Sequence, residues 1–180
     1  MTTEQRIKFD LVIPEDIKQI QSVFKQNGFK LYVVGGAVRD ALLGITPKDF
    51  DLATNAVPDK VEEMMKAAGL NTIGTGKAFG VINVFTSDGE YEIATFREDT
   101  TKGRNPEVKL GATIESDAAR RDLRINALYY DLDTNEIIDL VGGVDDLKNG
   151  EINMVGNAQE RFEEDPLRIL RFFRFFSRFN

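Results

Sequence analysis

Residues 31–52 read LYVVGGAVRDALLGITPKDFDL, and this stretch decides how the chain folds. Its first four residues are apolar, which predicts a short buried strand. A pair of glycines ends that strand, and residues 37–43 then predict a helix that stops at a further glycine. Residues 49–52 alternate polar and apolar side chains, as a half-buried strand does. The stretch therefore predicts a strand, a glycine turn, a helix and a second strand in direct succession.

The rest of the chain predicts more helices and strands in alternation. Residues 100–111 combine glycine, proline and charge and predict a loop, whereas residues 166–180 predict a last helix. Strands separated by helices, with antiparallel hairpins among them, indicate an α+β fold. The other expected elements are helices over 14–27, 58–68 and 114–128, strands over 81–86 and 91–96, and a hairpin of 129–133 with 136–140.

The composition excludes several kinds of chemistry. The chain has 180 residues and contains neither cysteine nor histidine. Disulfides, thiolate zinc sites, histidine-ligated metals and Ser-His-Asp triads are therefore impossible in it. Any metal ion must be held by oxygen ligands, which favours magnesium, with manganese as an alternative.

The charge and the hydropathy limit the partners. The net charge is -7, whereas proteins that bind nucleic acids non-specifically are usually basic. An RNA partner would have to be held by local basic patches or by parts outside this chain. The first residues are polar and charged, and no apolar run approaches membrane-spanning length, so we expect a cytoplasmic protein without a membrane partner.

Asp49 and Asp51 form the first candidate site. Residues two apart on a strand project from the same face. Neighbouring carboxylates repel each other unless a cation lies between them, and such a pair can bridge two magnesium ions. A solvated strand edge has the same Asp-x-Asp pattern, so the pair alone leaves both interpretations open.

The glycine turn before the first helix of this stretch is the second candidate site. Gly35 and Gly36 let backbone N–H groups approach a ligand closely, and a helix N-terminus attracts phosphate. Arg39, one turn into the helix, would add a fixed positive charge. A tight turn with a surface pair of Arg39 and Asp40 is the alternative. The G-x-G-x-x-G spacing of a dinucleotide fold is absent, and a phosphate cradle before paired carboxylates suits nucleotidyl transfer.

These two sites together resemble the first motif of the class II tRNA nucleotidyltransferase and bacterial poly(A) polymerase family. The resemblance covers residues 30–175. It implies a polymerase-beta-like nucleotidyltransferase head over residues 1–140, with a mixed sheet flanked by helices, followed over residues 141–180 by a hinge and the first helix of an α-helical neck. Further stretches resemble the family's motifs in order: EIATFR at 92–97, RRDLRINA at 120–127, DLVGGVDDL at 139–147 and RFEEDPLRILR at 161–171.

The resemblance implies roles for the side chains of the head. Asp49 and Asp51 would hold two magnesium ions, and Glu92, on a neighbouring strand, would help to activate the primer's 3′ hydroxyl. Arg121 and Asp122 would recognise the ribose 2′ hydroxyl, because a carboxylate accepts that hydrogen bond and deoxyribose cannot donate it. The structural alternative for Glu92 is a charge on the face of a strand. For Arg121 and Asp122 it is pairing with Arg120 on the surface of a helix.

The resemblance also implies a base-reading site. The Asp165 carboxylate would accept a hydrogen bond from the amino group of cytosine or adenine, and Arg168 would donate to ring nitrogens or a carbonyl. Uracil and guanine present a carbonyl oxygen at that place and would be rejected. Arg171 and Arg174 would line the nucleotide pocket near the triphosphate. Asp165 also suits the N-cap of a helix beginning at Pro166, and the arginines also suit a solvated basic face.

The function that the resemblance implies is CCA addition, which transfers CMP and AMP from CTP and ATP to tRNA 3′ ends without a template. Bacterial poly(A) polymerase is the nearest alternative, although residues 74–79 fit its pattern poorly. A non-catalytic nucleotide- or RNA-binding module, and transfer to a protein or a small molecule, are further alternatives that the complete motif set disfavours. Leu123 and Arg124 replace the family's usual phenylalanine and threonine, which removes no proposed ligand.

The helical body and tail that grip tRNA in the family have no counterpart in the 180 residues. Five phenylalanines lie within residues 172–179, and so much aromatic surface on a terminal helix normally packs against a partner. We therefore expect either that the natural chain continues into a missing C-terminal body and tail, or that a second subunit in a homo-oligomer covers this helix.

Overall fold

The computed structural model of the chain describes residues 4–101 and 108–156. Its helices are α1 (Glu15–Gln26), α2 (Gly36–Leu42), α3 (Pro58–Ala67), α4 (Ile114–Ala119) and α5 (Gly143–Asn149), with the 3-10 turns η1 (Lys77–Phe79) and η2 (Arg124–Asn126). Its strands are β1 (Gln5–Lys8), β2 (Leu31–Val34), β3 (Asp51–Thr54), β4 (Asn71–Ile73), β5 (Val81–Phe85), β6 (Glu90–Thr95), β7 (Arg97–Asp99), β8 (Val108–Leu110), β9 (Leu128–Asp131) and β10 (Glu136–Asp139).

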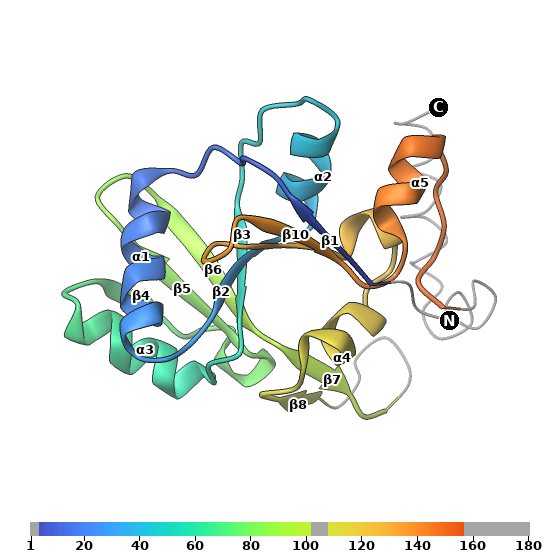
Figure 1. Cartoon of the computed structure of the whole chain (residues 1–180). Coiled ribbons are helices and arrows are strands. Elements are labelled where there is room, and N and C mark those ends of the chain that lie inside the picture. Colours follow the sequence, from blue (N-terminus) through green and yellow to red (C-terminus); the bar gives the residue numbers. More distant parts are fainter. Residues whose placement is uncertain (1–3, 102–107, 157–180) are drawn as a thin grey trace.

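A mixed sheet of eight strands forms the centre of the molecule, in the order β1-β10-β9-β2-β3-β6-β5-β4 (Figure 1). Its neighbouring strands are antiparallel except β3 and β6, which are parallel. A second, two-stranded sheet pairs β7 with β8. The predicted α+β class with a mixed sheet flanked by helices is confirmed.

The two faces of the large sheet carry different cores. Helices α1 and α3 lie side by side over one face, where Ile17, Ile20 and Phe24 of α1 are fully buried (Figure 1). These residues recur at helical spacing, so the amphipathic pattern that predicts α1 is also what seats it on the sheet. The other face carries a smaller core that contains Tyr32 and Phe96, and α4 packs on it.

The elements with strong local patterns lie where the sequence predicts them. Helix α3 begins at Pro58, strand β2 has four buried residues, and the β9–β10 hairpin turns through Asn135, whose φ is 55°. In the part of the chain that the structure describes, no helix is long and apolar enough to cross a membrane. The helix predicted over residues 166–180 lies outside the described residues.

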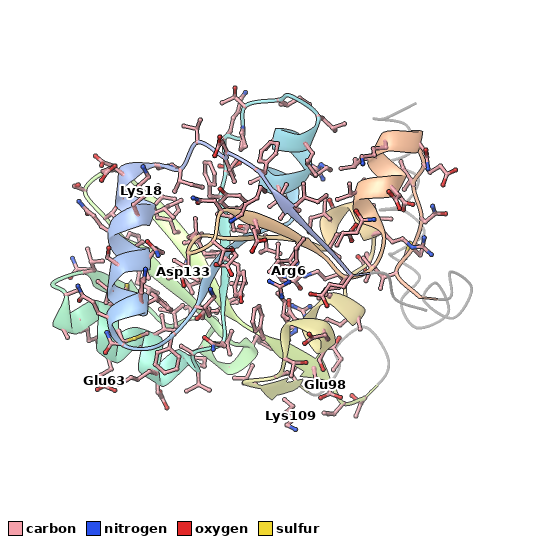
Figure 2. All side chains as sticks on the ribbon, viewed as in Figure 1. Arg6, Lys18, Glu63, Glu98, Lys109 and Asp133 are labelled. Carbon is pink, nitrogen blue, oxygen red and sulfur yellow. The ribbon has the colours of Figure 1, made fainter. Side chains whose placement is uncertain are left out.

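The predicted loop over residues 100–111 is wrong at its C-terminal end. Residues 108–110 form β8 and pair with β7, so that Glu98 lies opposite Lys109. Both side chains point outward from this small sheet (Figure 2). Strands β1 and β4 were also missed; β1 is the edge strand beside β10, and β4 is the edge strand beside β5. Such short edge strands give too few alternating residues for a periodic signal.

The helix predicted over residues 114–128 is also wrong, because α4 ends at Ala119. The backbone beyond it bonds to a distant segment instead. The Asp122 carbonyl accepts from the Val155 N–H at 2.9 Å, and the Arg124 N–H donates to the Asn153 carbonyl at 3.0 Å. Backbone groups used in this way cannot form the i to i−4 bonds of a helix.

A buried aspartate organises the joint after β10. Asp139 is 0% exposed, and its carboxylate accepts the backbone N–H groups of residues 141–144 at 2.9–3.2 Å. Helix α5 begins inside this set and packs against η2. The motif that the resemblance implies to be a hinge is thus closely bonded to the head in this structure.

Candidate active site

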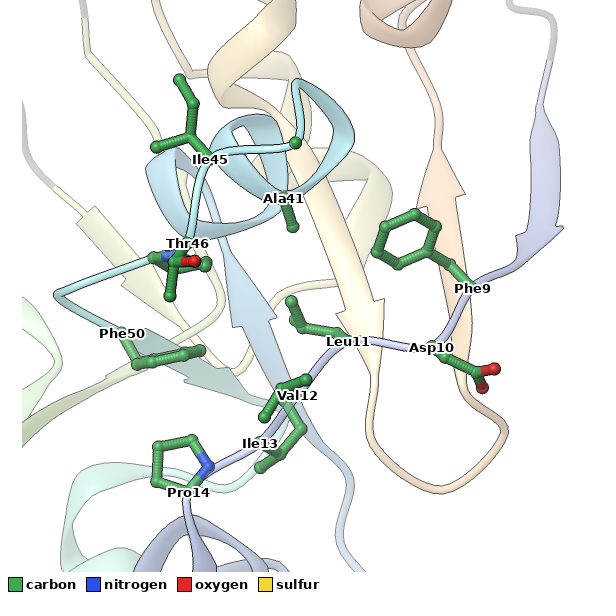
Figure 3. A pocket seen from close by; sticks show the side chains of 12 residues that line it. Phe9, Asp10, Leu11, Val12, Ile13, Pro14, Ala41, Ile45, Thr46 and Phe50 are labelled. Atoms are coloured by element: carbon green, nitrogen blue, oxygen red, sulfur yellow. The ribbon is translucent and has the colours of Figure 1, made fainter.

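The two candidate metal ligands lie where the chain from α2 enters the sheet. Asp51 is the first residue of β3, whereas Asp49 precedes the strand rather than lying in it as predicted. Phe50, between them, packs against the main core on the side of residues 11–14 (Figure 3). Side chains alternate along a strand, so Asp51, the residue after Phe50, projects to the face of the sheet away from this core.

Burial and two neighbouring charges act on the Asp51 carboxyl. Partial loss of water raises the pKa of the Asp51 carboxyl above its usual range, although much of the side chain remains exposed. The positive charge of Arg121 acts against this increase, and the negative charge of Asp49 adds to it. A cation between the two carboxylates would relieve both the repulsion and the loss of hydration.

Glu92 lies on β6, the parallel neighbour of β3. The register pairs Leu52 with Ile93, so Asp51 and Glu92 are neighbours on the same face, and both are exposed. Among residues 4–101 and 108–156, no three acidic side chains converge closely enough to hold one metal ion. Magnesium keeps several waters and is usually bound by one or two carboxylates together with substrate phosphates. The Asp49–Asp51 pair fits that manner of binding.

The glycine turn is shaped as a sharp entry into α2. Gly35 has φ 79° and ψ -128°, which favours glycine, and its N–H donates to the Leu128 carbonyl at 3.0 Å. A Cβ at Gly36 would lie 3.2 Å from the guanidinium of Arg39. Glycine at this second position therefore leaves room for the arginine side chain.

Arg39 is 6% exposed and joins two elements. Its Nη1 donates to the Asn126 amide oxygen of η2 at 2.6 Å, and its Nε donates to Asp40 at 3.0 Å. The pair with Asp40 exists, but it is largely buried rather than on the surface. These contacts show Arg39 supporting the turn, and its contact with a phosphate stays a prediction.

Arg121 lies on a buried network at the end of α4. Its Nη2 donates to Asp117 at 3.0 Å, and its Nε donates to the Tyr129 hydroxyl oxygen at 3.1 Å. Asp122 follows it in the non-helical segment, and the Asp122 backbone carbonyl accepts a hydrogen bond from the Val155 N–H. The structure thus fixes the backbone of the predicted ribose-reading pair, while the role of each side chain stays a prediction.

Asp165, Arg168, Arg171 and Arg174 lie outside the described residues. The base-reading and triphosphate-binding roles that the resemblance implies for these four residues therefore stay predictions.

Sequence reasoning missed the residues that hold the Arg39 and Arg121 side chains in place. Asp117 precedes Arg121 by four residues, a spacing that brings side chains together on a helix and offered a usable signal. Tyr129 and Asn126 offered none, because their contacts depend on how β9 and η2 pack against α2 and α4.

Comparison with known proteins assigns this chain to a family. The model of the poly A polymerase head domain matches residues 31–153, which include both aspartates, Glu92, Arg121 and Asp122. The chain belongs to the poly A polymerase head domain family. The match ends before the stretch 161–171 that resembles the base-reading motif.

Relatives in this family include enzymes with two different names. CCA tRNA nucleotidyltransferase 1, mitochondrial, of Homo sapiens is 40% identical over 176 residues, which are 97% of this chain and 40% of that protein. Poly(A) polymerase I of Salmonella typhi is 38% identical over 181 residues, covering 93% of this chain and 38% of its own length. The chain therefore spans about 40% of the length of these relatives.

Solved structures agree with this family. The CCA-adding enzyme of Bacillus stearothermophilus in complex with CTP superposes with a TM-score of 0.80 at 36% identity, over 91% of this chain and 39% of that one. A tRNA nucleotidyltransferase complexed with a primer tRNA and an incoming ATP analog gives a TM-score of 0.70 at 32% identity, over 87% and 44% of the two chains. The nucleotidyltransferase head fold is thereby confirmed.

Proposed function

We propose that this chain is the catalytic head of a template-independent RNA nucleotidyltransferase, which adds CMP and AMP from CTP and ATP to tRNA 3′ ends. The observation that carries the proposal is the exposed Asp49–Asp51 pair at the start of β3, with Glu92 beside it on β6. The family membership and the CTP and tRNA complexes of its structural relatives support it.

The residues of this chain would divide the chemistry among them. Asp49 and Asp51 would hold two magnesium ions, which neutralise the negative charge that develops on the transferred phosphate. Glu92 would accept the proton of the RNA 3′ hydroxyl. The 3′ oxygen then bonds to the α-phosphorus, and pyrophosphate leaves. Arg121 and Asp122 would hold the ribose of the incoming nucleotide.

The direct test uses tRNA that lacks its CCA end and CTP, ATP, UTP or GTP, each labelled and supplied singly with magnesium. We expect CMP to be added from CTP alone, AMP to be added from ATP only to tRNA that CTP has already extended, and UTP and GTP to be rejected. Long AMP tails from ATP alone would instead support poly(A) polymerase, which is the second candidate because relatives of that name are 38% identical. No incorporation with any nucleotide would overturn both.

Sugar selection gives the first testable prediction. Asp122→Ala removes the proposed acceptor for the 2′ hydroxyl, and a hydrogen bond to a charged group contributes roughly 1.5–3 kcal/mol. We expect the preference for CTP over dCTP to fall by about tenfold or more, because about 1.4 kcal/mol corresponds to tenfold. The measurement is kcat/KM for both nucleotides, with exposed Asp145→Ala of α5 as the control. An unchanged ratio in Asp122→Ala would show that the carboxylate has a structural role.

Base selection gives the second prediction, which concerns a residue outside the described part of the chain. Asp165→Ala should weaken CTP and ATP incorporation and also reduce the rejection of UTP and GTP, because the clash between two acceptors disappears. If Asp165 is only an N-cap, the change should instead cost about 1 kcal/mol of stability and leave selection unaltered. A four-nucleotide incorporation assay and a melting curve on the same variant separate the two roles.

Two other expectations stay predictions. One is the cytoplasmic location, whereas the human relative is named as a mitochondrial enzyme. The partner of the C-terminal phenylalanines, whether a continuing chain or a second subunit, concerns residues that the structure does not describe.

A further inference from the structure

A fully buried carboxylate contacts Arg121 of the candidate site, and the proposed chemistry makes no use of it. Asp117 is 1% exposed. It accepts hydrogen bonds from the Tyr129 hydroxyl at 2.6 Å, from the Arg97 backbone N–H at 3.1 Å and from Arg120 Nε at 3.4 Å. Arg121 donates to it through Nη2 at 3.0 Å and through Nε at 3.3 Å. One side chain thus gathers donors from β7, β9 and the segment after α4.

Asp117 is held as an anion. Burial acts to raise the pKa of this carboxyl, but the charges of Arg121 and Arg120 and the bonds from Tyr129 and Arg97 outweigh it, so the pKa lies below its usual range. A buried charge is costly unless it is well paired, and hydrophobic replacements are often as stable. The presence of this buried charge is therefore explained better by the geometry that it imposes on its partners than by a gain in stability.

Tyr129 restrains Arg121 from a second side. Its hydroxyl donates to Asp117 and accepts from Arg121 Nε at 3.1 Å, and Arg121 Cζ lies 5.4 Å from the centre of its ring. The Tyr129 side chain is 0% exposed, and its ring packs edge-on against Tyr32 and Phe96 at centroid distances of 6.3 and 6.1 Å. The guanidinium is thus anchored through a ring that the core holds in place.

The sheet register places Tyr129 on the same side of the sheet as Asp51. Val34 of β2 is opposite Asp51 of β3 on one side and opposite Tyr129 of β9 on the other. Residues opposite each other share a face, so Asp51 and Tyr129 project to the same side, two strands apart. The Arg121 guanidinium, which bonds the Tyr129 hydroxyl, is therefore held on the side of the sheet that carries Asp51.

We propose that Asp117 and Tyr129 are positioning residues, which hold the Arg121 guanidinium beside the Asp49–Asp51 pair and thereby set the affinity for the incoming nucleotide. This inference rests on the proposed function. Neither residue touches the nucleotide, and each acts only through Arg121.

The chain offers a matched pair of variants for the test. Tyr129→Phe removes the hydroxyl that bonds Asp117 and Arg121. Tyr130→Phe makes the same chemical change at the next residue of β9, which is 1% exposed and faces the opposite side. The Tyr130 hydroxyl donates to the Phe9 carbonyl at 2.8 Å, far from the site. Both variants keep the ring, so similar small decreases in melting temperature are expected.

The measurement is the Kd for CTP, obtained by calorimetry with magnesium on the 180-residue chain, together with the melting temperature of each variant. We expect Tyr129→Phe to weaken CTP binding by roughly five- to tenfold, which is less than the loss of a direct bond to a charged group because Tyr129 acts only through Arg121. Tyr130→Phe should leave the Kd unchanged. In an Arg121→Ala background, adding Tyr129→Phe should weaken binding no further, because the residue through which it acts is gone.

Each other outcome has a definite meaning. Equal Kd values for Tyr129→Phe and Tyr130→Phe would overturn the positioning role, and so would a further loss of affinity from Tyr129→Phe when Arg121 is already alanine. If the unmodified chain binds no CTP, the proposed function itself fails. Binding by the unmodified chain, with no difference between the two variants, would leave the proposed function standing and remove only this inference.

Discussion

Replacing Asp51 with alanine should abolish nucleotidyl transfer while the chain stays folded. Asp51 begins β3 and Asp49 lies two residues before it, and a magnesium ion held there would supply several kcal/mol of charge stabilisation in the transition state. Because each 1.36 kcal/mol or so changes a rate about tenfold, we expect kcat to fall by at least roughly 1000-fold. The measurement is single-turnover CMP addition at saturating magnesium.

The fold should survive this change for an electrostatic reason. Partial burial and the charge of Asp49 raise the pKa of Asp51, so its charged form is disfavoured in the folded chain despite the opposing effect of Arg121. Removing the carboxylate should therefore leave the melting temperature unchanged or slightly higher. Glu63→Ala is the control, since this side chain is 70% exposed on α3, away from the sheet face with the site (Figure 2). Turnover by Asp51→Ala close to the unmodified rate would rule out its role as a metal ligand.

The largest effect on stability should come from Gly143→Ala. A Cβ at this position would lie 2.2 Å from the Arg124 carbonyl oxygen, 2.8 Å from its carbonyl carbon and 3.1 Å from a methyl group of Leu128. Two of these are backbone atoms of η2, which cannot move aside as the end of a flexible side chain can. Overpacking usually costs about 1–3 kcal/mol, and a clash with backbone belongs at or above the upper end of that range.

We therefore expect Gly143→Ala to lower the free energy of unfolding by about 3 kcal/mol or more, measured by urea unfolding. Gly89→Ala in the β5–β6 turn is the matched control, because a Cβ there meets only Tyr91 side-chain atoms at 3.7–3.9 Å. That control should unfold close to the unmodified chain. A Gly143→Ala chain as stable as the control would contradict the close packing of α5 on η2.

The sequence by itself determined the parts of this protein that depend on residues close together in the chain. The order of β2, the glycine turn, α2 and β3 follows from local periodicity and from where glycine is placed. The residue types and spacing of Asp49, Asp51 and Glu92 suit metal-assisted transfer, and they can be recognised in the sequence. The absence of cysteine and histidine alone limits any metal ion to oxygen ligands.

Only the tertiary structure decided the features whose partners are distant in the sequence. Helix α4 stops at Ala119 because Asp122 and Arg124 bond to residues 153–155, which no local pattern announces. The contact of Tyr129 with Asp117 and Arg121 depends on which face of β9 meets α4. The sheet register places Asp51, Glu92 and Tyr129 on one side. The alternation of side chains along one strand is a local property. Which strand lies next to it, and in which register, is set by the packing of the whole sheet.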